Sequence, residues 1–184
     1  MRKRDNSNVS NPETLDVAPE DQSLIYAEIT DQIAAQIGKI VTLHTLLNQK
    51  MIDVYRVILH VETHDAAALA YGAIPTWRIR METLRQVLDQ GTASAADSAS
   101  YATIIEEFEW ISKIRDECTQ SVWWTDSLGR LWISRTDKAT AKLLDTRLFD
   151  EHILQSCCDR IPRLMDMIFE TTAVTIDLMD RQTS

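Results

Sequence analysis

The sequence has few residues that turn a chain sharply. Its 184 residues include 4 glycines and 4 prolines, whereas a fold of many short strands needs a turn about every 8–12 residues. This scarcity excludes a fold made mainly of strands and favours long helices. The length is near the usual size of one domain, so the chain can bury a core without metal or disulfide cross-links.

Cysteines are also few. Cys118, Cys157 and Cys158 are odd in number and lack the spacing of a disulfide framework, so we expect thiols that form no disulfide, in a reducing compartment. We read them as small buried side chains rather than nucleophiles. No run approaches the roughly 20 apolar residues of a membrane span, and no signal segment follows the basic start. The sequence predicts a cytoplasmic protein without a membrane partner.

Positive charge is the third deficit. There are 19 lysines and arginines against 28 aspartates and glutamates, which gives a formal net charge of −9. Proteins that bind DNA over a wide surface need clustered basic side chains to contact phosphates. The charge therefore argues against a broad surface for nucleic acid or for an anionic membrane, but it leaves room for a small local basic site.

The apolar pattern predicts an all-α fold, a four- to five-helix bundle. Residues 1–20 are polar and predict a disordered N-terminal arm, and 21–184 predict a single helical-bundle domain. A long first helix is expected from about Asp21 to His60, with Gly38 inside it as a possible break. Apolar residues follow one another along this helix in alternating steps of four and three, which is a heptad seam. A seam of this length also favours a homodimer through this helix. The seam residues are Ile33, Ile37, Ile40, His44, Leu47, Met51, Val54 and Ile58.

The rest of the chain predicts shorter helices and one non-helical element. Residues 66–74 either extend the first helix or connect it to the next, and 91–100 read as a small-residue loop. A glycine-bearing turn between two β-prone runs predicts a short hairpin or ordered loop over 121–136. The expected helices span about Thr76–Gln90, Tyr101–Thr119 and Asp150–Met179, the last with a kink or restart at Pro162.

Histidines supply weak candidates for chemistry. On a helix, His60 and His64 would share a face and could hold a metal ion, but no third ligand is evident and exposed side chains are the simpler interpretation. His44 occupies a seam position, where a packed and hydrogen-bonded histidine is expected. We therefore predict no metal and no other cofactor.

Basic and aromatic residues are grouped in the middle of the chain. Together they could bind phosphate and stack on bases, or bind a protein partner. The alternative is a set of exposed charges paired with acids, over tryptophans that seal the core. The candidate binding residues are Arg78, Arg85, Lys113, Trp123, Trp124 and Arg130.

The order of these features resembles the HEPN superfamily of small helical bundles. The matching landmarks are a Gly38-Lys39-Ile40 step in the first helix, the segment from Trp77 to Leu84, and a third helix that ends in Arg115-Asp116. Tryptophans, a glycine turn and a last helix follow, so the resemblance covers about residues 30–180. It implies a helical scaffold, a tendency to form dimers, and an Arg-Asp motif that carries ribonuclease activity in members with a histidine four to six residues after the arginine.

That histidine is missing here. Arg115-Asp116 is followed by Glu117 and then Cys-Thr-Gln-Ser, and neither Gln120 nor Ser121 can move a proton near neutral pH. The resemblance thus implies a degenerate member. Arg147 and His152 repeat the Arg-x4-His spacing, but five helical residues place two side chains about 140° apart, so joint action would need an irregular segment between them.

Three hypotheses follow. The first is a non-catalytic or weakly active HEPN-like bundle that binds RNA or a partner, which by the resemblance belongs to a bacterial defence or toxin–antitoxin system. The second is a protein-binding helical adaptor or chaperone that dimerises through its first helix. The third is an active ribonuclease that uses Arg115 and Asp116, or Arg147 with His152.

Overall fold

The computed structural model describes residues 25–91, 95–136, 140 and 142–182. The described residues form two compact units. The helical unit contains residues 29–121 and 150–182, and the sheet unit contains residues 25–28 and 122–149 with the gaps given above. The predicted arm, residues 1–20, lies outside the described residues. The prediction of one domain over 21–184 stays a prediction.

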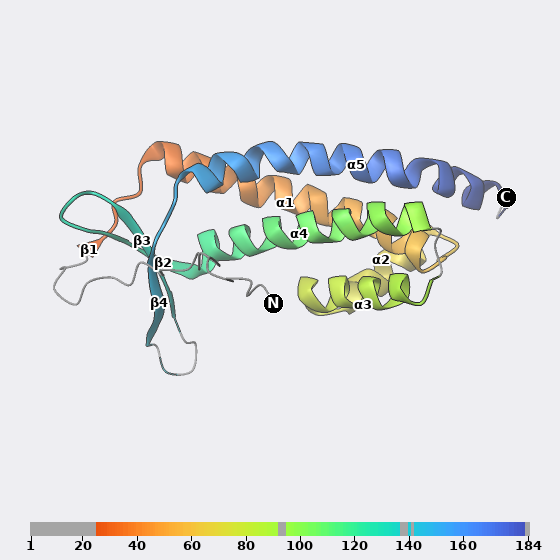
Figure 1. Ribbon diagram of the computed structural model, residues 1–184, viewed down its shortest axis with the longest axis horizontal. Coiled ribbons are helices and arrows are strands. Elements are labelled where there is room, and N and C mark those ends of the chain that lie inside the picture. Colours follow the sequence, from red (N-terminus) through yellow and green to blue (C-terminus); the bar gives the residue numbers. More distant parts are fainter. Residues whose placement is uncertain (1–24, 92–94, 137–139, 141, 183–184) are drawn as a thin grey trace, which may run out of the picture. The chain divides into compact units, whose positions relative to one another are not determined.

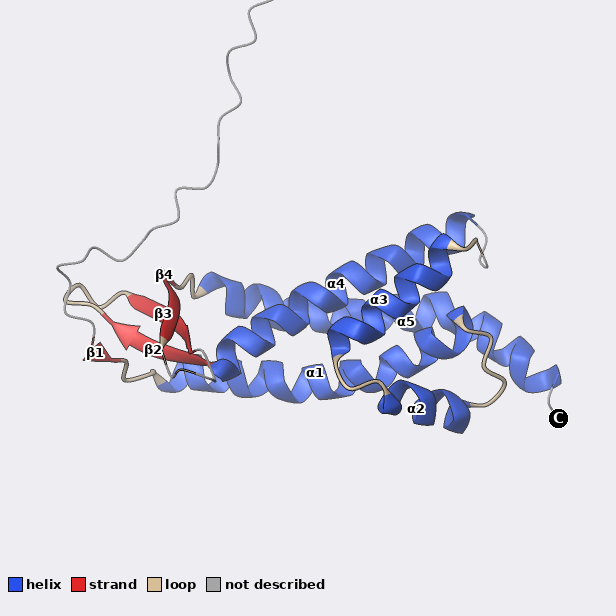
Figure 2. Cartoon of the chain, turned by 90° about the horizontal axis from the view of Figure 1, so that it is seen from below, coloured by secondary structure: helices blue, strands red, loops and turns tan. Residues whose placement is uncertain are grey.

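The helical unit confirms that the chain is mainly helical (Figure 1, Figure 2). The long α1 packs against α5, α4 and α2, and α3 packs against α4. None of the described helices is long and apolar enough to cross a membrane. The helices are α1 (Asp31–Ile58), α2 (His64–Ala73), α3 (Trp77–Asp89), α4 (Ala95–Gln120) and α5 (His152–Gln182).

Three threonines determine where the first three helices begin. Thr30, Thr63 and Thr76 are in extended conformation, and the hydroxyl of each accepts a hydrogen bond from the backbone N–H three residues on. The prediction that the first helix begins near Asp21 was therefore wrong, because Thr30 caps it and Ile25–Tyr26 form strand β1.

The predicted heptad seam forms the core of the helical unit. Every seam residue except Ile37 is buried, and α1 runs without a break through Gly38. Gln36 contacts Gln155 at 3.1 Å and Arg56 contacts Asp180 at 2.5 Å, so α1 and α5 run in the same direction. The core of this unit is thus built on two parallel helices from opposite ends of the sequence (Figure 1).

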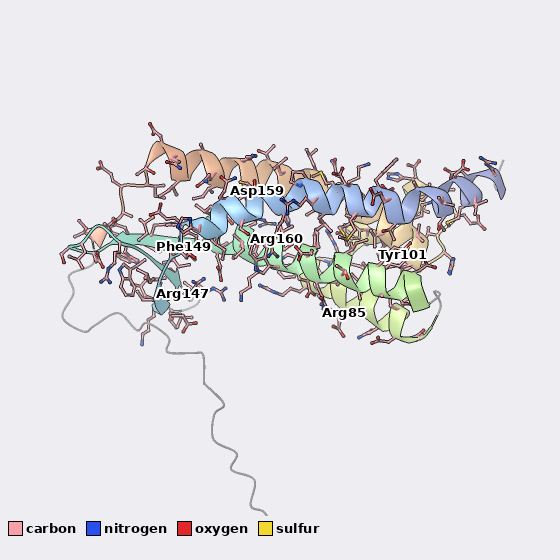
Figure 3. The ribbon with its side chains drawn as sticks, turned by 45° about the horizontal axis from the view of Figure 1, so that its top comes forward. Arg85, Tyr101, Arg147, Phe149, Asp159 and Arg160 are labelled. Carbon is pink, nitrogen blue, oxygen red and sulfur yellow. The ribbon has the colours of Figure 1, made fainter. Side chains whose placement is uncertain are left out.

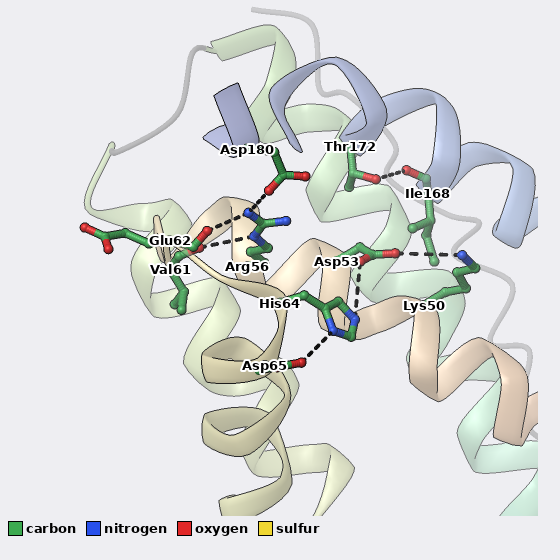
Figure 4. Close-up of polar contacts among 10 residues, drawn as sticks. All are labelled: Lys50, Asp53, Arg56, Val61, Glu62, His64, Asp65, Ile168, Thr172 and Asp180. Carbon is green, nitrogen blue, oxygen red and sulfur yellow. Dashed lines mark hydrogen bonds and ion pairs between the residues drawn. The ribbon is translucent and has the colours of Figure 1, made fainter. Parts of the chain in front are cut away.

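A buried arginine fixes the far end of α1. Arg56 donates from Nη2 to the carbonyl oxygen of Glu62 and to Asp180 Oδ1, both at 2.5 Å, and from Nε to the Val61 carbonyl at 3.3 Å (Figure 4). These contacts join α1, the turn after it and the last turns of α5. They also end α1 at Ile58, two residues earlier than predicted.

A polar network then positions α3. Asn48 Oδ1 on α1 accepts hydrogen bonds from the Tyr71 hydroxyl at 3.0 Å and from Arg80 Nη1 at 3.4 Å. The Arg80 guanidinium lies 4.3 Å from the centre of the Tyr71 ring and donates to the Ile74 carbonyl. Residues 66–73 belong to a separate helix, α2, that links α1 to α3, and Ile74 follows its end.

Two other boundaries differ from the prediction. The small-residue segment 91–100 was expected to be a loop, but α4 already begins at Ala95, because alanine is a strong helix former. Pro162 does not restart the last helix, since α5 is one helix through that position.

The sheet unit is larger than the predicted hairpin. Strands β2 (Ser121–Thr125) and β3 (Leu131–Thr136) confirm the two β-prone runs, and β1 (Ile25–Tyr26) and β4 (Leu143–Leu148) flank them in the order β1-β2-β3-β4. The pairing of β3 with β4 contains an irregularity between Ile133 and Arg135, and Asp145 opposite it has a φ of 47°. The all-α class is thus confirmed only in part.

Candidate functional site

The Arg115-Asp116 motif lies at the contact of α3 with α4. Asp116 accepts a hydrogen bond from Trp77 Nε1 at 3.0 Å, and Arg115 Nη1 lies 2.9 Å from its other carboxylate oxygen. Arg78 Nη2 approaches the same carboxylate at 3.8 Å. Because the indole and the neighbouring arginine hold Asp116 on both oxygens, the carboxylate is part of the packing between the two helices.

The structure brings a histidine to this motif from α1. His44 Nε2 lies 2.9 Å from the Ser112 hydroxyl, and its ring stacks on Phe108 with centroids 5.6 Å apart. Burial lowers the pKa of His44 to about 4; the charge of Arg115 acts in the same direction and that of Asp116 opposes it. The seam position indicated a packed histidine, and this was confirmed, but spacing along the sequence could not show that it lies near Arg115.

His44 does not replace the missing motif histidine. Only 5% of it is exposed, and with a pKa of about 4 it stays neutral and hydrogen-bonded at neutral pH. Gln120, at a motif position, ends α4 with its side chain exposed, and the Ser121 hydroxyl is buried without a hydrogen-bond partner among the described residues. None of these three side chains therefore offers an exposed group suited to proton transfer.

The predicted basic residues fall into two classes. Arg78, with 66% of its side chain exposed, lies over the Trp77 ring, and Lys113 is exposed on α4. Arg85, which Figure 3 labels, instead makes a two-pronged ion pair with Glu109, with both N···O distances at 2.5 Å. The structure therefore places Arg78 beside the motif, leaves Lys113 exposed on α4 and pairs Arg85 with Glu109.

Arg160 links α5 to α4 on the surface of the helical unit. Arg160 lies on α5 (Figure 3). It contacts Glu107 on α4 at 3.2 Å, and its guanidinium lies 4.4 Å from the centre of the Trp110 ring. The simpler interpretation of the basic residues predicted pairing of this kind. It holds for Arg85 with Glu109, and also for Arg78 and Arg115, which both pair with Asp116.

The two predicted tryptophans differ in their exposure to solvent. Trp123 is buried and meets Phe149 edge to face, with ring centroids 4.8 Å apart. Trp124 is partly exposed, stacks on Tyr26 and donates from Nε1 to the Ser134 hydroxyl at 2.9 Å. Trp123 thus belongs to the core of the sheet unit, whereas Trp124 stays partly exposed beside Tyr26. Sequence analysis missed Tyr26, because it lay in a segment predicted to be helix.

Arg130 is held by a buried acid. Its Nε lies 2.7 Å from Asp126 Oδ2, which also accepts from Trp132 Nε1 at 3.0 Å, while Asp126 Oδ1 accepts from the backbone N–H groups of Leu128 and Arg130 at 2.9 Å. Burial opposes the charged form of Asp126, but these hydrogen bonds outweigh it and hold its pKa well below the usual range. Asp126 is therefore the residue around which the β2–β3 turn is built.

The other candidates do not form a site. Arg147 pairs with Ile133 in the sheet unit and His152 begins α5 of the helical unit, so no helix carries both. His60 lies outside any helix with a φ of 52°, and His64 begins α2, so their predicted shared helix face was wrong.

Neither His64 nor the buried cysteines form a reactive or metal-binding group among the described residues. His64 lies 3.9 Å from Asp53 and from Asp65 (Figure 4), but the described residues contain no group of three or more suitable ligands for a metal ion. Burial raises the pKa of both Cys118 and Cys157 to about 12, and neither forms a disulfide. At neutral pH these thiols are protonated, which agrees with their interpretation as packing residues.

Comparisons with protein-family models, with curated proteins and with solved structures each found no match. The HEPN resemblance therefore stays a prediction, and the site is interpreted from its own geometry.

Proposed function

We propose that the chain is a HEPN-like helical protein that binds RNA without cleaving it. By the resemblance, its setting is a bacterial defence or toxin–antitoxin system. The observation that supports this proposal is the motif itself: Arg78 and Arg115 flank a fixed Asp116, while His44 is buried and neutral. Arginine suits phosphate recognition because its guanidinium presents several donors in one plane.

The same geometry supports the proposal that RNA is bound without cleavage. Strand cleavage requires a group that exchanges a proton with the reacting oxygens, and such a group must reach the substrate. Gln120 is exposed but does not titrate, and His44 is buried against Ser112 and Phe108. RNA held by the arginines would therefore stay intact.

The test combines RNA retention with cleavage by the purified full-length chain. We expect RNA to be retarded at low salt and to remain whole. Arg78→Ala with Arg115→Ala should weaken binding, whereas Arg163→Ala, which removes an exposed charge from α5, should not. Gln120→His restores a histidine at the family's spacing and should introduce cleavage, which Arg115→Ala should remove again.

Each alternative has its own outcome in this test. If the wild-type chain cleaves RNA and Arg115→Ala abolishes that cleavage, the protein is an active ribonuclease. If no RNA is retained at low salt, the helical adaptor is the better description and RNA binding is wrong.

We also propose that the protein forms a homodimer through α1. One exposed side of this helix carries small, uncharged residues at helical spacing, and nothing lies within 4 Å of where a Gly38 side chain would begin. A second helix can approach such a surface closely. Sedimentation velocity should give the mass of a dimer, and a monomer at micromolar concentration would contradict the proposal. The exposed residues are Ala34, Gly38, Val41, Thr42 and Thr45.

A further inference from the structure

The sheet unit carries an aromatic pair that is open on one side. Tyr26 of β1 lies opposite Trp124 of β2 in register, and the two rings stack with centroids 4.7 Å apart and planes 23° from parallel. The bond from Trp124 Nε1 to Ser134 fixes the indole on the sheet. Tyr26 is 77% exposed. One side of its ring is thus covered by the indole, and another flat ring can continue the stack.

A cation lies on the same sheet face. Ser134, which Trp124 contacts, is two residues from Trp132 on β3, so both tryptophans project from one side of the sheet. The Arg130 guanidinium lies 5.7 Å from the centre of the Trp132 ring and is held there by Asp126, with 44% of its side chain exposed. The face therefore combines an open aromatic ring with a positioned positive charge.

The charge of this segment differs from that of the whole chain. Residues 122–149 contain five lysines and arginines and three aspartates, whereas the chain as a whole carries a net charge of −9. A protein aromatic side chain could also stack on Tyr26, but it would bring no negative charge for the basic segment. A nucleotide brings both a flat base and a phosphate.

From this combination we propose that Tyr26 and Trp124 form a stacking platform for an unpaired base of single-stranded RNA, whose phosphate is contacted by Arg130. This inference rests on the proposed RNA binding and names a place where it occurs. Of the two tryptophans predicted from the sequence, the platform includes Trp124 and leaves out Trp123, because Trp123 is buried.

The test measures binding of a short labelled oligo(A) strand and of an abasic strand of equal length to the full-length chain by fluorescence anisotropy. Tyr26→Ala should weaken oligo(A) binding about tenfold, since one base stacked on an aromatic ring supplies roughly that factor. Tyr26→Phe keeps the ring and should bind as the wild type does. Phe169→Ala removes a ring that is 65% exposed in the helical unit and is the matched control. The abasic strand should bind the wild type and Tyr26→Ala equally.

The platform is wrong if Tyr26→Ala binds oligo(A) as tightly as the wild type, or if the abasic strand binds the wild type as well as oligo(A) does. In either case the proposed RNA binding is still supported if the variant that combines Arg78→Ala with Arg115→Ala binds RNA more weakly than the wild type. If the wild type retains neither strand at low salt, the proposed function and the platform both fail.

Discussion

The helical unit and the sheet unit are stabilised in different ways. In the helical unit, aliphatic side chains at helical spacing fill the core, and buried polar side chains are few, with His44 and Arg56 both hydrogen-bonded. In the sheet unit, one carboxylate organises a turn, and aromatic rings cover the strands. The first unit depends on packing and the second on directed hydrogen bonds, so the two should respond differently to substitution and to pH.

The largest effect should come from a cavity in the helical unit. Phe108 is fully buried and stacks on His44, so Phe108→Ala should lower the free energy of unfolding by about 3–5 kcal/mol. Phe169→Ala removes the same side chain from an exposed position and should change it by about 0.5 kcal/mol or less. Urea denaturation measures both. Equal effects would show that Phe108 is not in the core of the folded protein.

Acid should weaken the helical unit through His44. The folded pKa is about 4 and the unfolded value is about 6.5, so below pH 6.5 the unfolded chain takes up a proton that the folded chain does not. Stability should fall by about 3 kcal/mol as the pH drops from 6.5 to 4. Urea denaturation at both pH values, with His44→Gln for comparison, measures this loss. The prediction fails if the substituted protein has the same pH dependence over this range.

A smaller and local effect is expected at Asp126. Its folded pKa lies below the unfolded value, so its contribution is present above about pH 4 and is lost as the pH falls through the folded pKa. Asp126→Asn should abolish that acid dependence and weaken the tryptophan signal in near-ultraviolet circular dichroism, while the helical signal in the far ultraviolet stays. Parallel loss of both signals would show that the two units do not respond separately.

The helices were predictable because their signals are local and repeated. The seam from Ile33 to Ile58 fixes one face of α1 at every turn, and Pro75 with Thr76 marks the start of α3. The start of α1 was not predicted, because Thr30 competes with several polar residues before it that could equally cap a helix. Strand β1 could not be found at all, since two residues have no period and their partners lie 98 or more positions away.

The candidate site shows the same division. Arg115 and Asp116 were identified from their neighbours in the sequence, and the structure places them together. Tertiary packing brings His44 near them, Trp77 to Asp116 and Tyr26 onto Trp124. Residue type indicated that these side chains need partners, but it could not say which ones.

The pairing of α1 with α5 has a consequence for synthesis of the chain. The two helices are separated by more than 90 residues, and contacts so distant in sequence form late. While the ribosome is still making α2, α3, α4 and the sheet, the side of α1 that packs against α5 lacks its cover. The nascent protein therefore displays a long apolar helix until its final segment emerges, and that interval is when a chaperone or a second nascent copy would meet it.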